Sequence, residues 1–248
     1  QGYFETLGIP YSGSGVLTSA LTFNKLHCNR YVQQFGIQVP KSVIIRRGED
    51  YRRKTIVEQL GLPCFIKPRQ GGSSFGISKV SNLKDFDAAV QDALKEDSVA
   101  IVEEFIDGTE LTCGALKTDE EELIFPITEI VSKNDFFDYQ AKYNAEYADE
   151  ITPARIPESV ETDIKFTTSK LYDLLECNGI ARADFIWKDE KIYFLEINTV
   201  PGMTERSLIP QEIEAMGLQA GEVLHKSIAD AIKRMSKMLP GDEEGPSE

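Results

Sequence analysis

Two stretches near the C-terminal end of the chain, residues 181–187 and 191–198, alternate between apolar and polar side chains. Alternation with a period of two predicts two neighbouring β-strands joined by a short turn. One face of each strand is apolar, and we expect these faces to meet the core. The residues on the expected core faces are Ala181, Ala183, Phe185 and Trp187 on the first strand, and Tyr193, Leu195 and Ile197 on the second.

The opposite faces of these strands carry charged and amide side chains. Directly opposed residues of an antiparallel pair lie about 5 Å apart at Cβ. A pairing of Asp184 with Glu196 also pairs Arg182 with Asn198, and it requires an odd loop centred on Glu190. Facing carboxylates repel each other unless a cation lies between them, and such oxygen ligands suit Mg²⁺. We therefore predict a nucleotide–metal site, with an ordinary charged surface hairpin as the alternative.

Two glycine-containing segments support a ligand site. The first follows a predicted strand that ends at Lys67 and includes Ser73 and Ser74, which add hydroxyl donors to the backbone amides that glycines bring around phosphate oxygens. It is not a Walker A loop, and a glycine-rich turn without a ligand is its alternative. The second segment contains Pro201 and Gly202, which break the strand beside the predicted metal.

Composition excludes several classes of function. The net charge of −14 argues against nucleic acid or an anionic membrane as a general partner. The four cysteines lack metal or disulfide spacing, so we expect buried free thiols and a reducing, cytoplasmic location. Only two histidines are present, which leaves little room for a histidine-based metal site or a catalytic triad.

Helical and strand patterns alternate along the chain and predict an α/β fold. Helices are expected at 18–35, 82–95, 158–177 and 221–238, and strands at 41–47, 64–67, 77–80, 99–105, 110–117 and 123–131. Residues 132–156 form a long polar stretch without a clear period, which is typical of a loop that works on a ligand.

The order of these motifs resembles the D-alanine–D-alanine ligase family of the ATP-grasp superfamily. The shared segments run from Gly13-Ser-Gly15 through Lys67-Pro, Val102-Glu-Glu-Phe-Ile106, Tyr139-Gln-Ala-Lys-Tyr143 and Arg182-Ala-Asp184 to Pro201-Gly-Met-Thr. The resemblance implies an ATP-grasp fold in which two α/β subdomains clasp ATP. The implied parts are a linker from a missing N-terminal domain at 1–17, a small subdomain at 18–106, a large subdomain at 107–240 with a lid at 132–156, and a disordered acidic tail at 241–248.

The resemblance also implies a role for each matching residue. Those implied for the nucleotide are Lys25, Lys67, Ser73, Ser74 and Lys142 at the phosphates, Glu103, Glu104 and Ile106 at the adenine, and Glu110 at the ribose. Those implied for catalysis and the second amino acid are Ser73, Tyr143, Arg182, Gly202, Ser207 and Leu208. Asp184, Glu196 and Asn198 would hold two Mg²⁺ or Mn²⁺ ions.

The implied reaction is the ATP-dependent ligation of two D-alanines through an acyl phosphate, for peptidoglycan precursor synthesis, by an enzyme that is a homodimer. The acidic residue that binds the first D-alanine in the family has no match here, because it belongs to the missing domain. Two alternatives follow: another ATP-dependent carboxylate–amine ligase, including one that uses D-lactate, or an ATP-binding fragment without turnover. In the resembled family a tyrosine at the position that matches Tyr143 goes with an amine as the second substrate, so the resemblance implies a peptide bond rather than an ester.

Overall fold

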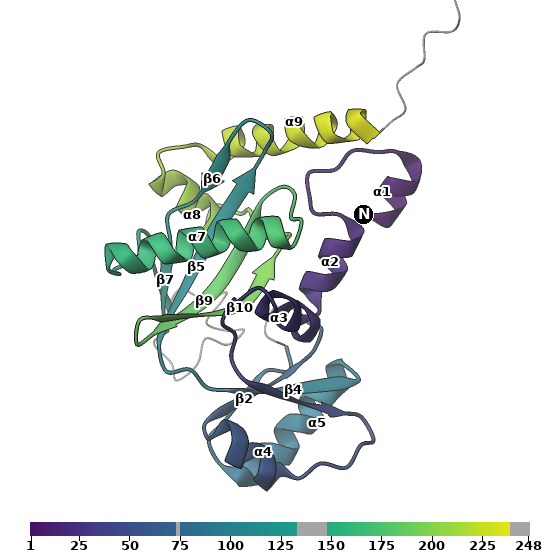
Figure 1. Cartoon of the computed structure of the whole chain (residues 1–248), viewed down its shortest axis with the longest axis vertical. Coiled ribbons are helices and arrows are strands. Elements are labelled where there is room, and N and C mark those ends of the chain that lie inside the picture. The colour runs from purple at the N-terminus through teal and green to yellow at the C-terminus, as the bar shows by residue number, and fades with distance from the viewer. Residues whose placement is uncertain (73–74, 133–147, 239–248) are drawn as a thin grey trace, which may run out of the picture.

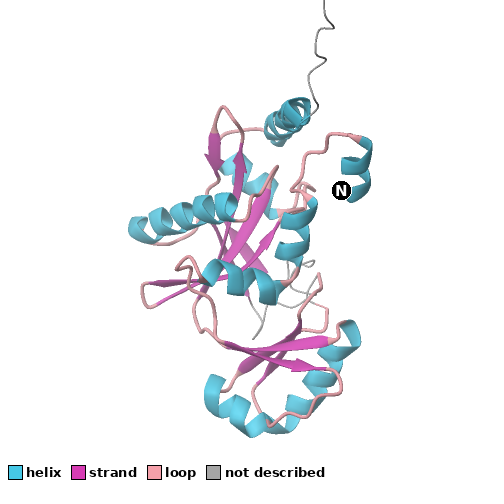
Figure 2. Ribbon diagram, turned by 45° about the vertical axis from the view of Figure 1, so that its right-hand side comes forward, coloured by secondary structure: helices cyan, strands magenta, loops and turns pink. Residues whose placement is uncertain are grey.

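The computed structural model describes residues 1–72, 75–132 and 148–238. Within these ranges the chain forms two antiparallel sheets, each covered by helices, and Figure 1 shows the smaller sheet below the larger one. Figure 2 shows that loops, rather than strands, run between the two sheets.

The smaller sheet has the strand order β1-β4-β2-β3. Its strands are β1 (Ser42–Arg46), β2 (Cys64–Pro68), β3 (Ser78–Val80) and β4 (Val99–Glu104), and its helices are α4 (Arg53–Leu60), η1 (Leu83–Asp85) and α5 (Phe86–Glu96). In Figure 1, α4 and α5 cover the same face of this sheet. Phe86 and Val90 of α5 are fully buried against Ile66 and Val102 of the strands, so the unit has its own apolar core.

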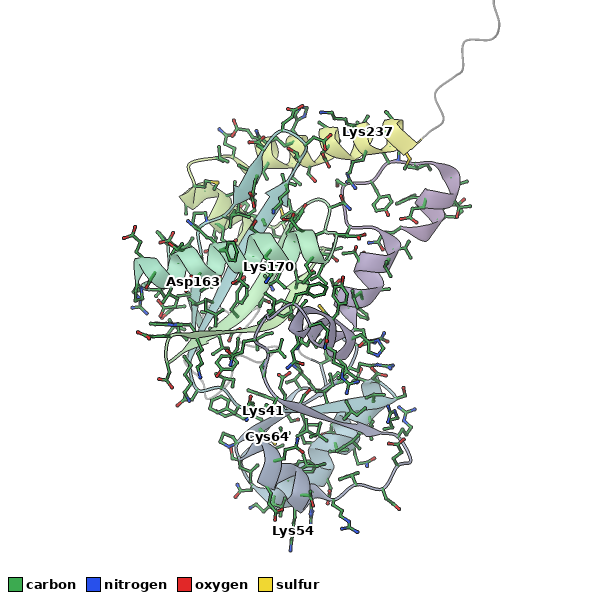
Figure 3. All side chains as sticks on the ribbon, in the orientation of Figure 1. Lys41, Lys54, Cys64, Asp163, Lys170 and Lys237 are labelled. Atoms are coloured by element: carbon green, nitrogen blue, oxygen red, sulfur yellow. The ribbon has the colours of Figure 1, made fainter. Side chains whose placement is uncertain are left out.

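The larger sheet has the order β10-β9-β5-β7-β8, and β6 pairs with β5 beside this path. Its strands are β5 (Thr109–Lys117), β6 (Glu122–Ile124), β7 (Thr128–Ser132), β8 (Ala148–Ile151), β9 (Ala181–Lys188) and β10 (Lys191–Asn198). The helices of this unit are α7 (Glu158–Leu174), α8 (Leu208–Ala215) and α9 (Ala220–Met238). Figure 3 labels Asp163 and Lys170 on α7 and Lys237 on α9, whereas Lys41 and Cys64 lie in the smaller unit.

The N-terminal segment contains α1 (Gly2–Leu7), α2 (Val16–Phe23) and α3 (Lys25–Gln33). One helix was expected over 18–35, and this prediction was wrong because Asn24 interrupts it. The Asn24 side chain accepts a hydrogen bond from the His27 amide at 3.1 Å, which begins a new helix, and its backbone forms a β-bridge with Gln70. Cys28 and Val32 of α3 belong to the core of the larger sheet. The subdomain limits stay a prediction, but this packing places α3 with the larger unit.

Other expectations were partly wrong. The strand expected over 123–131 is two strands, β6 and β7, separated by residues 125–127. The long polar stretch contains β8, which pairs with β7, and the sequence patterns did not predict α1, α4 or α8. The cysteine prediction is confirmed, since Cys28, Cys64, Cys113 and Cys177 are all free and buried. In the described part of the chain, no helix is long and apolar enough to cross a membrane.

Candidate active site

Strands β9 and β10 pair in the predicted register at the end of the hairpin that carries the polar residues. Glu196 lies opposite Asp184, and Asn198 lies opposite Arg182. The two carboxylates are therefore cross-strand neighbours, as the metal hypothesis requires.

The turn that we predicted for this register was wrong. The turn is not an odd loop centred on Glu190, because it consists of Asp189 and Glu190, whose φ values are 48° and 60°. Two left-handed residues form a tight two-residue hairpin turn. A β-bulge after Phe194 then shifts the register by one residue. As a result Phe194 is fully buried, whereas Tyr193 and Leu195, which we expected on the core face, are only partly buried.

Arg182 and Asp184 form a two-pronged ion pair on β9. Arg182 Nε donates to Asp184 Oδ1 and Nη2 donates to Oδ2, both at 2.8 Å. Thr112 Oγ1 of β5 donates to the same Oδ1 at 2.9 Å. Burial alone would lower the pKa of the Arg182 guanidinium, but the charge and hydrogen bonds of Asp184 outweigh burial and raise it above its ordinary value. Arg182 is thus a fixed, permanent cation on the polar face of the hairpin.

Lys25 connects the hairpin to the glycine- and serine-rich loop. Its ammonium lies 2.8 Å from Glu196 Oε2 and donates to the Gly71 carbonyl oxygen at 3.0 Å. The Lys25 backbone amide donates to the Arg69 carbonyl at 3.1 Å, which fixes the start of α3 against the same loop. One lysine therefore bridges the predicted phosphate loop and a predicted metal ligand.

Lys67 and Glu103 form a buried ion pair between β2 and β4. Their Nζ and Oε2 atoms lie 2.7 Å apart, and the two side chains are 9% and 6% exposed. The register places Phe65 opposite Glu103, so Lys67 is the diagonal neighbour of Glu103 across the strands. The family resemblance implied roles at opposite ends of ATP, with Lys67 at the phosphates and Glu103 at the adenine. The structure brings them into direct contact.

The other predicted nucleotide residues in the described ranges lie on β4, directly after it, and on β5. Glu104 accepts a hydrogen bond from the Lys41 amide through Oε1 at 2.8 Å, and its own amide donates to the Lys41 carbonyl at 3.0 Å. The Glu104 amide therefore already donates within the protein. Ile106 follows β4 and is buried, and Glu110 lies on β5 opposite Ile130.

Gly202, Ser207 and Leu208 lie together at the start of α8. The Ser207 hydroxyl accepts from the Thr204 amide at 3.2 Å and shares a hydrogen bond of 2.8 Å with the Thr204 hydroxyl. A Cβ atom at Gly202 would lie 2.8 Å from Ser207 Oγ, so only glycine fits there without a shift. Leu208 is the first residue of α8, where helix amides favour an anionic group.

The oxygens of Asp184, Glu196 and Asn198 are the donor types that Mg²⁺ prefers, so the donor set fits the predicted ion. Asp184 and Glu196 are each paired with a side-chain cation here, and Asn198 Oδ1 accepts from the Val200 amide at 3.0 Å. A metal ion would have to share these donors with Arg182 and Lys25. Among described residues there is no group of three or more His, Cys, Asp and Glu side chains with metal-site geometry, but the predicted set includes an amide.

Four predicted residues lie outside the described ranges. They are Ser73, Ser74, Lys142 and Tyr143. Their roles at the phosphates and at the second substrate stay predictions, as does the lid at 132–156, of which the structure describes only the ends.

Sequence comparison assigns the chain that carries this site to a known family. A family model described as D-ala D-ala ligase C-terminus matches residues 31–229. A curated D-alanine–D-alanine ligase of Phocaeicola vulgatus is 51% identical over 225 residues, which are 90% of this chain and 69% of that protein. The chain belongs to the D-alanine–D-alanine ligase family.

Solved structures of D-alanine ligases support this assignment. The VanG D-Ala:D-Ser ligase from Enterococcus faecalis superposes with a TM-score of 0.80 at 36% identity, covering 93% of this chain and 67% of that one. A D-alanine–D-alanine ligase from Bacillus anthracis complexed with ATP gives a TM-score of 0.81 at 29% identity, covering 96% of this chain and 76% of that one. The predicted ATP-grasp fold of the D-alanine–D-alanine ligase family is confirmed.

One buried acid in the site region was missed by the sequence reasoning. Glu212, one turn into α8, is fully buried, and its Oε2 accepts from the Gly114 amide at 2.8 Å. Burial raises the pKa of Glu212 well above its usual value, although the Gly114 hydrogen bond and the charge of Arg182 oppose the shift. The available signal was a glutamate on the apolar face of a segment that also contains Ile209 and Ile213.

Proposed function

We propose that this chain is an ATP-dependent ligase that joins two D-alanines into D-alanyl-D-alanine. The observation that carries the proposal is the opposition of Asp184 and Glu196, each paired with a cation, at strand ends that lead into the turn at Gly202 and the start of α8. We propose that these metal donors act together with Gly202, Ser207 and Leu208, which suit an oxyanion and a carboxylate. The family assignment and the likeness to an ATP-bound ligase support the same reaction.

In the first step, a carboxylate oxygen of the first D-alanine attacks the terminal phosphorus of ATP. The bond from that phosphorus to the leaving ADP oxygen breaks, which gives an acyl phosphate. Lys25 and Lys67 offset the negative charge of the phosphates, and Glu103 accepts from the adenine amino group. Because Lys67 and Glu103 are paired with each other, the nucleotide has to compete with this ion pair.

Asp184, Glu196 and Asn198 are the residues that would hold Mg²⁺ or Mn²⁺. Two such ions, when bound, supply neutralisation of charge on the transferring phosphoryl group. Glu110 is proposed to accept from the ribose hydroxyls.

In the second step, the amine of the second D-alanine attacks the acyl carbon. The carbon–oxygen bond to phosphate breaks, and the amine loses a proton. The Arg182 guanidinium and the Gly202 amide would stabilise the oxyanion that forms on the tetrahedral intermediate. Ser207 and the Leu208 amide would bind the carboxylate of the second D-alanine, because the start of a helix favours negative charge.

Further properties follow from the family pattern, the cysteines and the charge. Lys142, Tyr143, Ser73 and Ser74 are assigned to the closed site by the family pattern alone. Buried free thiols support a reducing, cytoplasmic location, and the net charge of −14 disfavours nucleic acid and anionic membranes as partners. The homodimer is carried over from the family resemblance.

The test is product analysis of the full chain with ATP and Mg²⁺. The chain is given D-alanine alone and then equimolar D-alanine with D-lactate or D-serine, and ADP and products are quantified by mass spectrometry. We expect one ADP for each D-alanyl-D-alanine, even with the competitor present. A predominant D-alanyl-D-lactate product would overturn the dipeptide assignment.

D-serine is the second candidate for the second substrate, because the likeness to a D-Ala:D-Ser ligase is as strong as the likeness to the ATP-bound ligase. ATP affinity is measured in parallel by calorimetry. ATP binding without any ligated product would instead favour a nucleotide-binding unit that does not turn over by itself.

A further inference from the structure

Glu212 closes a gap in the hydrogen-bond ladder of the larger sheet. Strand β5 pairs with β7 up to Thr112 and with β6 from Ala115, and Gly114 lies between the two pairings. The Gly114 carbonyl accepts from the Phe125 amide at 2.9 Å, but the Gly114 amide donates to Glu212 Oε2 instead of to a strand. A side chain of α8 thus supplies the acceptor where β6 and β7 separate.

The second carboxyl oxygen of Glu212 contacts the neighbouring strand. Thr128 Oγ1 of β7 donates to Glu212 Oε1 at 3.3 Å, and the Thr128 hydroxyl also shares a hydrogen bond of 2.6 Å with Thr152. One buried carboxyl group therefore links α8 to both β5 and β7. Removing it would leave the Gly114 amide without this partner in a dry environment, which is costly.

The first turn of α8 packs directly on the backbone of β5 at the same place. A Cβ atom at Gly114 would lie 2.5 Å from Ile209 Cδ1 and 2.6 Å from Glu212 Oε2. Ile209 is fully buried. The absence of a side chain at Gly114 lets the helix approach closely, and Glu212 fixes it there by a hydrogen bond. The two contacts together define the position of α8 on the sheet.

This anchor lies between two parts of the candidate active site. Gly114 is directly opposite Arg182 in the pairing of β5 with β9. One turn before Glu212, Ser207 and Leu208 form the start of α8. A displacement of α8 on β5 would therefore move the proposed binding groups for the second carboxylate relative to the proposed oxyanion group.

We propose that Glu212 is a positioning residue that sets the distance between the start of α8 and Arg182, and thereby the affinity for the second D-alanine. The inference rests on the proposed function of Ser207, Leu208 and Arg182. Glu212 itself touches no substrate in this account. It acts through the helix that it anchors to the Gly114 amide.

The matched variants are Glu212→Ala, Glu212→Asp and Glu212→Gln, with Glu214→Ala as control because Glu214 is an exposed glutamate of the same helix. Glutamine keeps the length and an acceptor for the Gly114 amide. Burial favours the neutral form of the Glu212 carboxyl, for which glutamine is a close substitute. Aspartate is one methylene shorter and cannot keep both contacts without moving α8, and it replaces alanine in the comparison if the alanine variant does not fold.

Ligation rates are measured at saturating ATP while D-alanine is varied, which separates the two D-alanine sites. For Glu212→Ala we expect the KM of the second D-alanine to rise about 10- to 100-fold, as for a buried amide that loses its partner. The KM for ATP and that for the first D-alanine stay unchanged. Glu212→Gln and Glu214→Ala retain the wild-type KM, and Glu212→Asp lies between. A thermal destabilisation of Glu212→Ala with an unchanged second KM would show a purely structural role and overturn the proposal.

A second readout does not depend on catalysis. Hydrogen exchange of peptides covering 204–213 is compared among the same variants, and we expect faster exchange of the first α8 turn in Glu212→Ala and Glu212→Asp only. If the wild type binds ATP but ligates nothing, the proposed function fails while this exchange pattern still supports the anchor. Unchanged exchange in the alanine and aspartate variants would contradict the anchor whatever the activity.

Discussion

Each of the two sheets carries a cluster of charged side chains. The charges of the two clusters are neutralised in different ways. In the smaller sheet, Lys67 and Glu103 neutralise each other within one strand pair. In the larger sheet, Asp184 is paired with Arg182 on its own strand, whereas Glu196 receives its cation from Lys25 at the start of α3. A ligand that binds at the smaller sheet must therefore compete with the Lys67–Glu103 ion pair. At the larger sheet, one cation is fixed and the other comes from a separate element.

The comparison predicts the largest effect at Lys67. Lys67→Met leaves the Glu103 carboxylate buried without its cation, and loss of one partner of a buried pair costs about 3–5 kcal/mol. We expect this drop in the free energy of unfolding, measured by urea denaturation. In calorimetry, ATP should lose about ten- to a hundredfold in affinity through the missing phosphate contact, and adenosine less.

The double variant Lys67→Met with Glu103→Gln is the control for this experiment. It removes both charges, so most of the lost stability should return while the phosphate contact stays absent. If Lys67→Met is as stable as the wild type, Lys67 and Glu103 do not neutralise each other as a buried ion pair, and the comparison of the two sheets fails. Equal weakening of ATP and adenosine would remove Lys67 from the phosphate site.

The second effect concerns Arg182, which we expect to act on the reaction more than on nucleotide binding. Arg182→Met removes the proposed oxyanion group, and loss of one such donor lowers kcat about 10²- to 10³-fold. The affinity for ATP, measured by calorimetry, should change little. Arg52→Met, at an exposed arginine of the smaller unit, serves as the matched control. A parallel loss of ATP affinity and kcat would place Arg182 at the nucleotide instead.

A smaller effect is expected at Thr112, which donates the third side-chain hydrogen bond to Asp184. Thr112→Val keeps the shape and removes one hydrogen bond of 2.9 Å to Oδ1. We expect a loss of about 1 kcal/mol in the free energy of unfolding, with kcat reduced far less than in Arg182→Met. A kcat loss as large as that of Arg182→Met would mean that orientation of Asp184 by Thr112, rather than Arg182 itself, limits the reaction.

The smallest effect depends on pH and concerns Asp97, at the base of the glycine- and serine-rich loop. Asp97 accepts from Arg69 Nε at 3.2 Å and from the Gln70 amide at 2.9 Å. Burial alone would raise the pKa of Asp97, but the Arg69 side chain and backbone amides outweigh burial and hold it below its usual value. The contribution of the Asp97 carboxylate to the free energy of unfolding is therefore present above its unfolded pKa of about 3.9. It is lost as the pH falls through the folded pKa.

Asp97→Asn should consequently be less stable than the wild type at pH 7, and the difference should shrink below about pH 4. Urea denaturation at several pH values measures it. A stability difference that stays constant from neutral to acidic pH would contradict a depressed pKa at Asp97.

The parts of this structure that follow from side-chain periodicity were predictable. The alternation of β9 follows from a period of two, and the opposition of Asp184 to Glu196 was predicted from two carboxylates on one face, although a bulge and not the expected loop produces that register. The bulge after Phe194 was not predictable, because a bulge inserts one residue without requiring a particular residue type there. Because of this shift Phe194, rather than Tyr193 or Leu195, faces the core, whereas Ile197 is buried as expected.

The break at Asn24 and the role of Glu212 depend on contacts that are distant in the sequence. Asparagine is a poor helix-interior residue and a good N-cap, so a signal was present at Asn24, but its bridge to Gln70 decides the break. Glu212 meets its partner Gly114 across 98 residues of chain. The pairing of Lys67 with Glu103 likewise requires the register of two strands, which the sequence patterns did not set.

The central claim, that a D-alanine carboxylate attacks ATP and forms an acyl phosphate, is tested most directly by isotope transfer. D-alanine labelled with ¹⁸O in its carboxylate is ligated by the full chain, and the released phosphate is analysed by mass spectrometry. The account predicts one ¹⁸O atom in each phosphate, because the attacking oxygen leaves with the phosphoryl group. Phosphate without label, formed at the same rate as dipeptide, would contradict the acyl phosphate and the roles assigned to both charge clusters.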